Sequence, residues 1–243
     1  MGSRFTFPSD LRMRTLHNIS NDVVTILKGM HFHCAIFGSF ACSLYGVPVL
    51  RQPNDIDILV LPPRPATTES LKRAIFDHDN ERFGLEPSLN PDCQHKILYY
   101  RLKAKDGPHG FFAGNKCKID IVVPGVMELP RINSSHIKWL HDLPVLPFSI
   151  LVLQKLQGWD DHRQMLSNHK KYAKAATDAR DVQHLLTLEN QIKSSQSAQC
   201  WLGKEVLTKE FVESSERRVQ LFCQSYPGTQ DLLSRILGTN FDH

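Results

Sequence analysis

The sequence lacks long apolar runs and any strong excess of charge of one sign. No apolar stretch approaches the roughly 20 residues that a membrane-spanning helix needs, which argues against a membrane protein. Residues 1–10 lack the apolar core of a secretory signal. The 29 Lys and Arg residues against 25 Asp and Glu give a net charge of +4, which permits an anionic ligand without indicating nucleic-acid binding. We expect an intracellular, cytoplasmic protein with no membrane partner.

Paired cysteines are also missing. The six cysteines are scattered, and none forms the Cys-x-x-Cys pair of many zinc and redox sites. The segment HFHC offers His31, His33 and Cys34, but neighbouring side chains of a strand point to opposite faces, so we reject a zinc site there. The pattern is typical of a reduced intracellular protein without structural zinc.

Apolar residues are plentiful and regularly spaced. They make up 41% of the 243 residues, enough for a sizeable core in one larger or two smaller domains. Helical and strand periods alternate in the first part of the chain, which predicts a mixed sheet with helices. We expect helices at 10–29, 40–46 and 68–83, and strands at 33–37, 55–62, 95–103 and 116–125.

The character of the sequence changes after Pro147. From there the periodicity is helical, and we expect helices at 148–159, 171–186, 203–226 and 229–238. The sequence therefore predicts an α+β fold in which a mixed-sheet core, residues 1–146, precedes a C-terminal helical domain, residues 147–243.

Two acidic residues stand out in the predicted strand NDIDILV. Asp55 and Asp57 are two residues apart, so their side chains point to the same face. Like charges at that distance need a compensating cation, and a divalent metal such as Mg²⁺ prefers carboxylate oxygens. The simpler alternative is a pair of solvated residues at a strand start or edge.

Asp120 strengthens the metal hypothesis. It lies in KCKIDIVV, a predicted strand rich in β-branched residues, where a buried carboxylate without a partner is costly. If this strand runs beside the first, three carboxylates converge and can hold two divalent cations for in-line displacement at phosphorus. The alternative is an ion pair of Asp120 with Lys116 or Lys118.

A Gly-Ser pair follows the first predicted strand. Gly38 and Ser39 either reverse the chain or bring backbone N–H groups close to an anion at a helix start.

Together, FGSFACSLYG, NDIDILV and CKIDIVV resemble the nucleotidyltransferase superfamily built on the DNA polymerase β-like palm. Its pattern of Gly-Gly or Gly-Ser, then Asp-x-Asp, then a later Asp fits Gly38-Ser39, Asp55, Asp57 and Asp120. The 15-residue spacer between Ser39 and Asp55 is a little longer than is usual in that family.

The helical part resembles the AbiEii-type toxin and minimal nucleotidyltransferases, and the resemblance spans about residues 30–186. It implies that Lys155, Arg180 and Asp181 complete a nucleotide site, with Arg51 and Lys118 as further basic contacts. The plainer alternatives are that Lys155 is on the solvated side of a helix, that Arg180 and Asp181 form a surface pair, and that Arg51 is an ordinary loop residue.

Other residues have two interpretations as well. The basic run Lys170, Lys171 and Lys174 either meets an RNA backbone or faces water. Asp160 and Asp161 are most simply a helix-end pair. Three aromatic residues are expected in the core rather than as base-stacking platforms, namely Trp139, Phe148 and Trp159.

The expected activity is nucleotidyl transfer with Mg²⁺, or Mn²⁺ as the alternative. An NTP, by default ATP, gives its NMP to an acceptor hydroxyl and releases pyrophosphate. The resemblance implies metal ligation by Asp55, Asp57 and Asp120, with Asp120 as general base and Gly38 and Ser39 at the triphosphate. The acceptor stays open between RNA, including tRNA, a protein side chain and a small molecule such as an aminoglycoside or lincosamide. A non-catalytic nucleotide-binding protein is the second alternative, and the oligomeric state is open.

Overall fold

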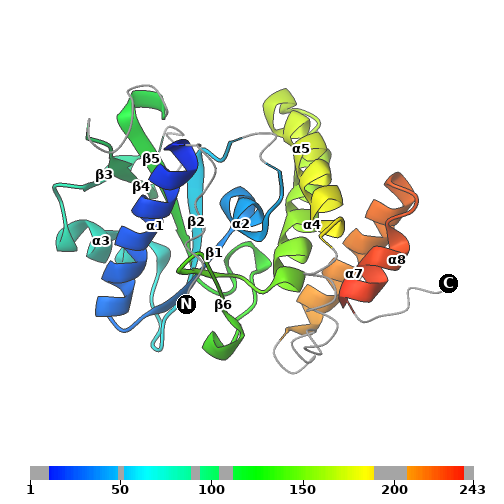
Figure 1. Ribbon diagram of the computed structural model, residues 1–243, viewed down its shortest axis with the longest axis horizontal. Helices are drawn as coiled ribbons and strands as arrows, with labels where there is room; N and C mark the ends of the chain where they lie inside the picture. The colour runs from blue at the N-terminus through cyan, green and yellow to red at the C-terminus, as the bar shows by residue number, and fades with distance from the viewer. Residues whose placement is uncertain (1–10, 49–51, 89–93, 104–111, 189–206, 238–243) are drawn as a thin grey trace. The chain divides into compact units, whose positions relative to one another are not determined.

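The structure is a computed structural model, and it describes residues 11–48, 52–88, 94–103, 112–188 and 207–237, without the side chain of Lys170. Arg51, the first four residues of the predicted helix at 203–226 and the last residue of the one at 229–238 lie outside the described residues. Figure 1 shows the chain as a ribbon coloured along its length.

A seven-stranded mixed sheet forms the framework of the N-terminal half, in the order β3-β4-β5-β2-β1-β7-β6. Pairs β1–β7 and β2–β5 are parallel, and the other neighbouring pairs are antiparallel. The strands are β1 His33–Phe37, β2 Asp55–Leu61, β3 Phe83–Pro87, β4 Lys96–Arg101, β5 Lys116–Val122, β6 Lys138–Leu140 and β7 Leu143–Val145. The α+β fold with a mixed sheet, predicted from the sequence, is confirmed.

Buried and partly accessible side chains alternate along the central strands β2 and β5, because one face of the sheet is more buried than the other. In β2, Ile56 and Ile58 are fully buried, while Asp55 and Asp57 remain partly accessible. In β5, Ile119 is buried beside the partly accessible Asp120. The period of two thus places the apolar residues in the core and the acidic residues on the opposite face of the sheet.

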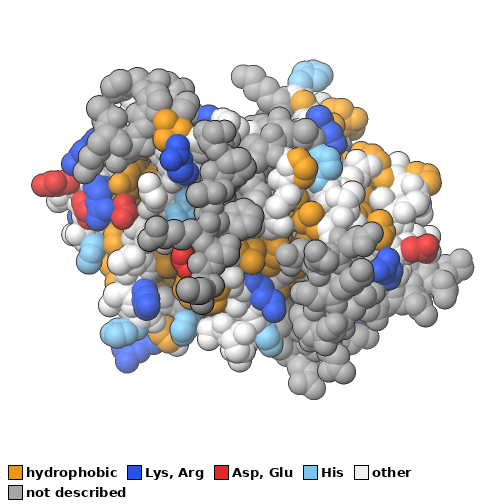
Figure 2. Space-filling view, viewed as in Figure 1, with side chains coloured by type: hydrophobic (Ala, Val, Ile, Leu, Met, Phe, Trp, Pro, Cys, Tyr) orange, Lys and Arg blue, Asp and Glu red, His pale blue; other side chains and the backbone are white. Residues whose placement is uncertain are grey.

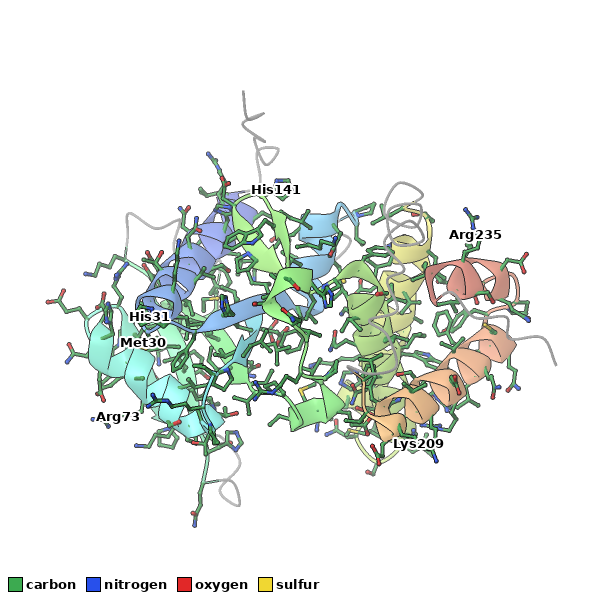
Figure 3. All side chains as sticks on the ribbon, turned by 90° about the horizontal axis from the view of Figure 1, so that it is seen from below. Met30, His31, Arg73, His141, Lys209 and Arg235 are labelled. Carbon is green, nitrogen blue, oxygen red and sulfur yellow. The ribbon has the colours of Figure 1, made fainter. Side chains whose placement is uncertain are left out.

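Two helices pack on this sheet. Helix α1, Leu11–Gly29, buries an apolar stripe that includes Leu16, Ile19 and Val23, and it contacts both the sheet and α3, Thr68–His78 (Figure 1). After α1 the chain turns through Met30 and His31, where His31 has a φ of 61° (Figure 3). The predicted helix at 10–29 and the strand at 33–37 are both present.

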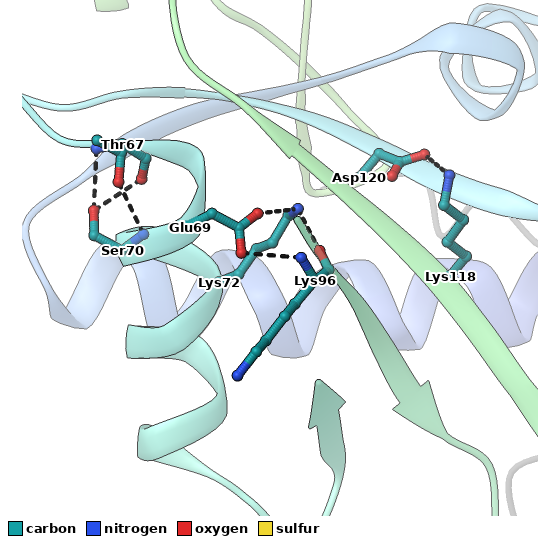
Figure 4. Close-up of polar contacts among 7 residues, drawn as sticks. All are labelled: Thr67, Glu69, Ser70, Lys72, Lys96, Lys118 and Asp120. Carbon is teal, nitrogen blue, oxygen red and sulfur yellow. Dashed lines mark hydrogen bonds and ion pairs between the residues drawn. The ribbon is translucent and has the colours of Figure 1, made fainter. Parts of the chain in front are cut away.

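Helix α3 ends earlier than the predicted helix at 68–83. Its start is fixed by a capping box, in which the Thr67 hydroxyl accepts from the Ser70 N–H and the Ser70 hydroxyl accepts from the Thr67 N–H (Figure 4). After His78 the Asp79 carboxylate accepts from the Arg82 N–H and closes a turn. Phe83 therefore starts β3 and packs its ring edge against Tyr100 of β4, instead of ending a helix.

The remaining helices are α2 Gly38–Tyr45, α4 Phe148–Gln164, α5 His169–Leu186, α7 Lys209–Ser225 and α8 Gln230–Leu237. Helix α4 is buried along most of its length, and Trp159 packs edge-on against Phe222 of α7. Phe148 and Trp159 lie in the core as predicted, whereas the same prediction for Trp139 is wrong, because its side chain on β6 is 63% exposed.

The residues form two compact units whose segments alternate along the chain. The first unit comprises Met1–Phe40, Val49–Val126 and Lys138–Val145, and the second Ala41–Pro48, Met127–Ile137 and Leu146–His243. The division into residues 1–146 and 147–243 stays a prediction. Within the described ranges, no helix combines the length and apolar character needed to cross a membrane, and the cytoplasmic location remains a prediction.

Candidate active site

Three carboxylates occupy neighbouring positions on two parallel strands. Asp57 on β2 is in register with Asp120 on β5, and Asp55 is in register with Lys118. Since alternate residues of a strand share a face, Asp55, Asp57 and Asp120 all lie on the same face of the sheet. The structure thus places β5 beside β2, the condition under which the sequence predicts that these carboxylates converge.

Gly38 brings the backbone against one of these carboxylates. It begins α2 directly after β1 and has a φ of 69°, a left-handed conformation that glycine adopts without steric cost. A methyl group at its Cα would lie 2.0 Å from Asp57 Oδ2. Any other residue at position 38 would therefore displace the Asp57 carboxylate. Ser39 follows in the first turn of α2 and is partly accessible.

Lys118 places a positive charge on this face. Its Nζ donates to Asp120 Oδ2 at 2.5 Å (Figure 4). Desolvation acts to lower the Lys118 pKa, but attraction to Asp120, Asp55 and Asp57 outweighs it and holds the pKa above its usual range. The alternative interpretation of Asp120 as an ion-pair partner is therefore present in the structure with Lys118, while Lys116 pairs with Glu86.

The donor set of this face has the chemistry of a magnesium site. Carboxylate oxygens are the ligands that hard divalent cations prefer. Among the described residues, however, no three His, Cys, Asp or Glu side chains are gathered closely enough to form a metal cluster in this conformation. Lys118 supplies the positive charge beside Asp120. The residues fit Mg²⁺ in chemical type, and a bound ion would compete with Lys118 for Asp120.

Lys155 lies in a separate polar cluster between α4 and α5. Its Nζ is 2.8 Å from Asp181 Oδ2 and 3.3 Å from Asp178 Oδ1, and its side chain is 5% exposed. Burial by itself lowers the Lys155 pKa, but Cys42, Asp181 and Asp178 together raise it above its usual range. The alternative of a solvated helix face is wrong for Lys155, because this side chain is a buried, doubly paired cation.

His162 completes this cluster. Its Nδ1 lies 2.7 Å from Asp178 Oδ2, so Asp178 joins His162 and Lys155. Sequence reasoning missed both Asp178 and His162. The signal was available as spacing, because Lys155 and His162 are seven residues apart on α4, and Asp178 and Asp181 are three apart on α5. Such spacings place side chains on one face of a helix.

The predicted pair of Arg180 and Asp181 separates. Asp181 turns toward Lys155, whereas the exposed Arg180 donates from Nε to the Ala176 carbonyl in its own helix. The alternative that Arg180 and Asp181 form a surface pair with each other is therefore wrong, because Asp181 pairs with Lys155. Arg51 lies outside the described residues.

Asp160 also differs from its prediction. Its side chain is fully buried, and its oxygens lie 2.7 Å from Arg163 and 2.6 Å from Arg217 of α7. The helix-end pair expected at Asp160 and Asp161 is wrong for Asp160, which joins α4 to α7.

Comparison with solved structures identifies the fold. The crystal structure of an antigenic nucleotidyltransferase-like protein from Paracoccidioides brasiliensis matches with a TM-score of 0.61 and 14% identity, covering 95% of this chain and 98% of that chain. Cid1 poly(U) polymerase with MgGTP bound matches with a TM-score of 0.33 and 16% identity over 65% of this chain and 45% of that one. Terminal uridylyl transferase 4 from Trypanosoma brucei with bound GTP matches with a TM-score of 0.36 and 15% identity over 91% and 68%.

The first of these matches extends over nearly the whole chain. The chain therefore has a nucleotidyltransferase-type fold, as its motifs predict. No family model and no curated protein matches the sequence. At 14% identity the likeness establishes the fold alone.

Proposed function

We propose that the protein is a metal-dependent nucleotidyltransferase that transfers NMP from an NTP, by default ATP, to an acceptor hydroxyl. The observation that carries the proposal is the register of Asp57 with Asp120 on adjacent parallel strands, with Asp55 on the same face. The Gly38 backbone packed against Asp57 adds a close backbone approach at a helix start, where phosphates commonly bind. The nucleotidyltransferase fold makes this arrangement interpretable as an active site.

The proposed reaction is an in-line displacement at the α-phosphorus. The acceptor oxygen forms a bond to that phosphorus, the bond to the bridging oxygen breaks, and pyrophosphate leaves. The proton of the acceptor hydroxyl passes to a carboxylate oxygen of Asp120. Asp55, Asp57 and Asp120 would hold Mg²⁺ or Mn²⁺, which when bound lowers the pKa of the acceptor hydroxyl and stabilises the leaving pyrophosphate.

The chain's other residues have supporting roles. The N–H groups at the start of α2, beginning at Gly38 and Ser39, face the anionic triphosphate. Lys118 orients Asp120 by its ion pair, and a bound Mg²⁺ would compete with it for the carboxylate. In the second unit, ion pairs with Asp181 and Asp178 stabilise the charged form of Lys155 and fix its position. The proposed role of Lys155 in triphosphate binding is therefore electrostatic. Arg51 and Arg180 remain proposed nucleotide contacts.

The test is the release of pyrophosphate and the fate of a labelled nucleotide. Each labelled NTP is incubated with Mg²⁺, the protein and a total RNA, protein or metabolite extract, and the labelled fraction identifies the acceptor class. Asp57→Asn preserves the shape of the side chain but removes a charged ligand, so we expect transfer to fall at least about 100-fold.

The matched control is Asp77→Asn. Asp77 is an exposed residue of α3 that pairs with Arg73 at the surface, so its replacement makes the same chemical change away from the site. We expect full transfer and an unchanged circular-dichroism spectrum. Full transfer by the Asp57→Asn protein would end the proposal, and Mg²⁺-dependent nucleotide binding without pyrophosphate release would identify a binding protein instead.

A further inference from the structure

An arginine of α1 contacts the segment that leads into β2. Arg12 donates from Nε to the Pro53 carbonyl at 3.0 Å and from Nη2 to the side-chain oxygen of Asn54. Pro53 is buried and lies two residues before Asp55, the first residue of β2. A guanidinium is a planar fork whose N–H groups have fixed directions, so one fork that donates to two acceptors fixes both of them. Arg12 therefore fixes the chain immediately before Asp55.

The same guanidinium contacts the segment that leads into β5. Arg12 Cζ lies 4.4 Å from the centroid of the Phe112 ring, which is within the range of a cation–π contact. Phe112 is buried, and its carbonyl accepts from the Asn115 N–H in the short turn before Lys116, where β5 begins. Arg12 thus contacts the segments that precede both of the strands carrying the three carboxylates.

These two segments enter the sheet at the same edge, because β2 and β5 are parallel neighbours. Asp55 pairs with Lys118, and Asp57 pairs with Asp120. A slip of either strand by one residue would turn its carboxylates to the opposite face, since side chains alternate along a strand. The register of β2 with β5 therefore decides whether the three carboxylates share a face, and Arg12 contacts the start of both strands.

The charge of Arg12 lies in the same neighbourhood as the carboxylates. Burial raises the pKa of the Cys117 thiol on β5, Asp55 raises it further, Arg12 lowers it and Asp57 raises it. The guanidinium and both carboxylates are therefore within electrostatic range of the same residue of β5. Arg12 can affect the site through its geometry or through its charge, and these two contributions are separable by substitution.

We propose that Arg12 is a positioning residue of the candidate active site. It holds the starts of β2 and β5 together and so keeps Asp55 and Asp57 aligned with Asp120. This role requires no contact of Arg12 with the substrate. The inference rests on the proposed function, since the aligned carboxylates are the proposed metal ligands. A purely structural link would make the same contacts but would affect stability alone.

Arg82 is the matched control. It also joins α1 to another segment of the first unit, because its Nη1 lies 2.7 Å from Asp22 Oδ2 of α1 and its Nε pairs with Asp79 before β3. Strand β3 is at the edge of the sheet and is separated from β5 by β4. Figure 2 shows acidic and basic side chains side by side at the left of the view, around α3 and β3. Arg82→Met therefore removes comparable contacts of α1 away from the three carboxylates.

The first test measures the binding of Mn²⁺ to the full chain by electron paramagnetic resonance, without nucleotide. Arg12→Met should weaken binding at least about tenfold, because losing a group that orients metal ligands costs about 10–100-fold in affinity. Arg82→Met should keep the parent affinity within about twofold, although both substitutions lower the free energy of unfolding. Parent affinity in the Arg12→Met protein, or equal weakening in both variants, would overturn the proposal.

Arg12→Lys separates geometry from charge. Lysine keeps the positive charge but replaces the planar fork by a single ammonium group. We expect the Arg12→Lys protein to bind Mn²⁺ at least about fivefold more weakly than the parent protein. Full affinity in this variant would show that charge alone is sufficient and would overturn the positioning role.

Hydrogen exchange tests the same role without metal. In the Arg12→Met protein, backbone N–H groups at the starts of β2 and β5 should exchange at least about tenfold faster relative to those of β3, and Arg82→Met should not produce this difference. An unchanged ratio in the Arg12→Met protein would overturn the proposal. If the parent protein does not bind Mn²⁺, the proposed metal-dependent function fails, whereas hydrogen exchange still decides whether Arg12 holds the two strands.

Discussion

Gly38 is the residue at which backbone conformation and site chemistry meet most directly. Its φ is positive, and a Cβ at this position would lie only 2.0 Å from Asp57 Oδ2. A side chain there costs about 1–2 kcal/mol in backbone strain and in addition pushes Asp57 from its position. We predict that Gly38→Ala lowers the free energy of unfolding by at least about 2 kcal/mol, measured by urea denaturation, and weakens Mn²⁺-dependent nucleotide binding.

Gly114 provides the control for this prediction. It has a φ of 65°, close to that of Gly38, but a Cβ there would meet nothing within 4 Å. Gly114→Ala therefore isolates the cost of the backbone conformation. Equal destabilisation by the two substitutions would contradict the importance of the contact with Asp57.

Lys155 is the second residue with a sharp energetic consequence. Its removal leaves Asp178 and Asp181 partly buried without their shared cation. We predict that Lys155→Met destabilises the fold by about 3 kcal/mol in thermal or urea unfolding, because breaking a buried ion pair leaves an uncompensated charge.

A second substitution separates this loss of charge balance from lost packing. Lys155→Met/Asp181→Asn should recover part of the stability, since it removes one of the two stranded carboxylates. Additive losses in the double variant would instead mean that the pair contributes little.

At the scale of elements, the fully buried Asp160 links α4 to α7. Desolvation acts to raise its pKa, but hydrogen bonds from Arg217, Arg163 and Gln164 outweigh this and hold the pKa below its usual value of 3.8. A lowered pKa contributes stability above pH 3.8 that is lost as the pH falls below it. We predict that Asp160→Asn costs about 3 kcal/mol near pH 7, and that its difference from the parent protein shrinks below about pH 4.

Unfolding measured by circular dichroism at several pH values checks this behaviour. Asp77→Asn is again a suitable control, because its ion pair with Arg73 is exposed and worth little. A difference between the parent and Asp160→Asn proteins that stays constant from neutral pH to about pH 3 would be incompatible with the ion-pair role of Asp160.

The elements also show where the sequence is informative. The strands β2 and β5 were predictable because polar residues alternate with apolar, mostly β-branched ones, and β1 was predictable because a short apolar run ends just before Gly38. The short strands β6 and β7 were not, because three residues carry no period and β7 contains Pro144. Strand β3 was assigned in part to the preceding helix, since Phe83 continues its apolar stripe and only the Asp79–Arg82 turn breaks it.

The candidate site was predictable to a similar degree. Asp55, Asp57 and Asp120 stand out because carboxylates interrupt apolar strands, but their register depends on the order of strands, which local pattern does not contain. Asp178 was missed because a polar residue on a helix is usually a surface residue. Its role is visible only when the fold places the buried Lys155 of the facing helix beside it.

At the scale of the whole molecule, the two units share the chain in alternating segments. The chain passes from one unit to the other after residues 40, 48, 126, 137 and 145. A cut at any point between the first and the last of these crossings therefore divides the segments of at least one unit between the two fragments. Stability measured on the full chain describes both units together.

The position of β1 has a consequence for synthesis of the protein. This strand leads into Gly38 and lies between β2 and β7 in the sheet. Its Ile36 pairs with Val145 of β7. While the ribosome is making the intervening residues, one edge of β1 has no neighbouring strand. Unpaired strand edges invite association with other chains. The nascent protein can therefore misassemble until Val145 has emerged from the ribosome. Chaperones that bind extended segments can bind β1 during that time.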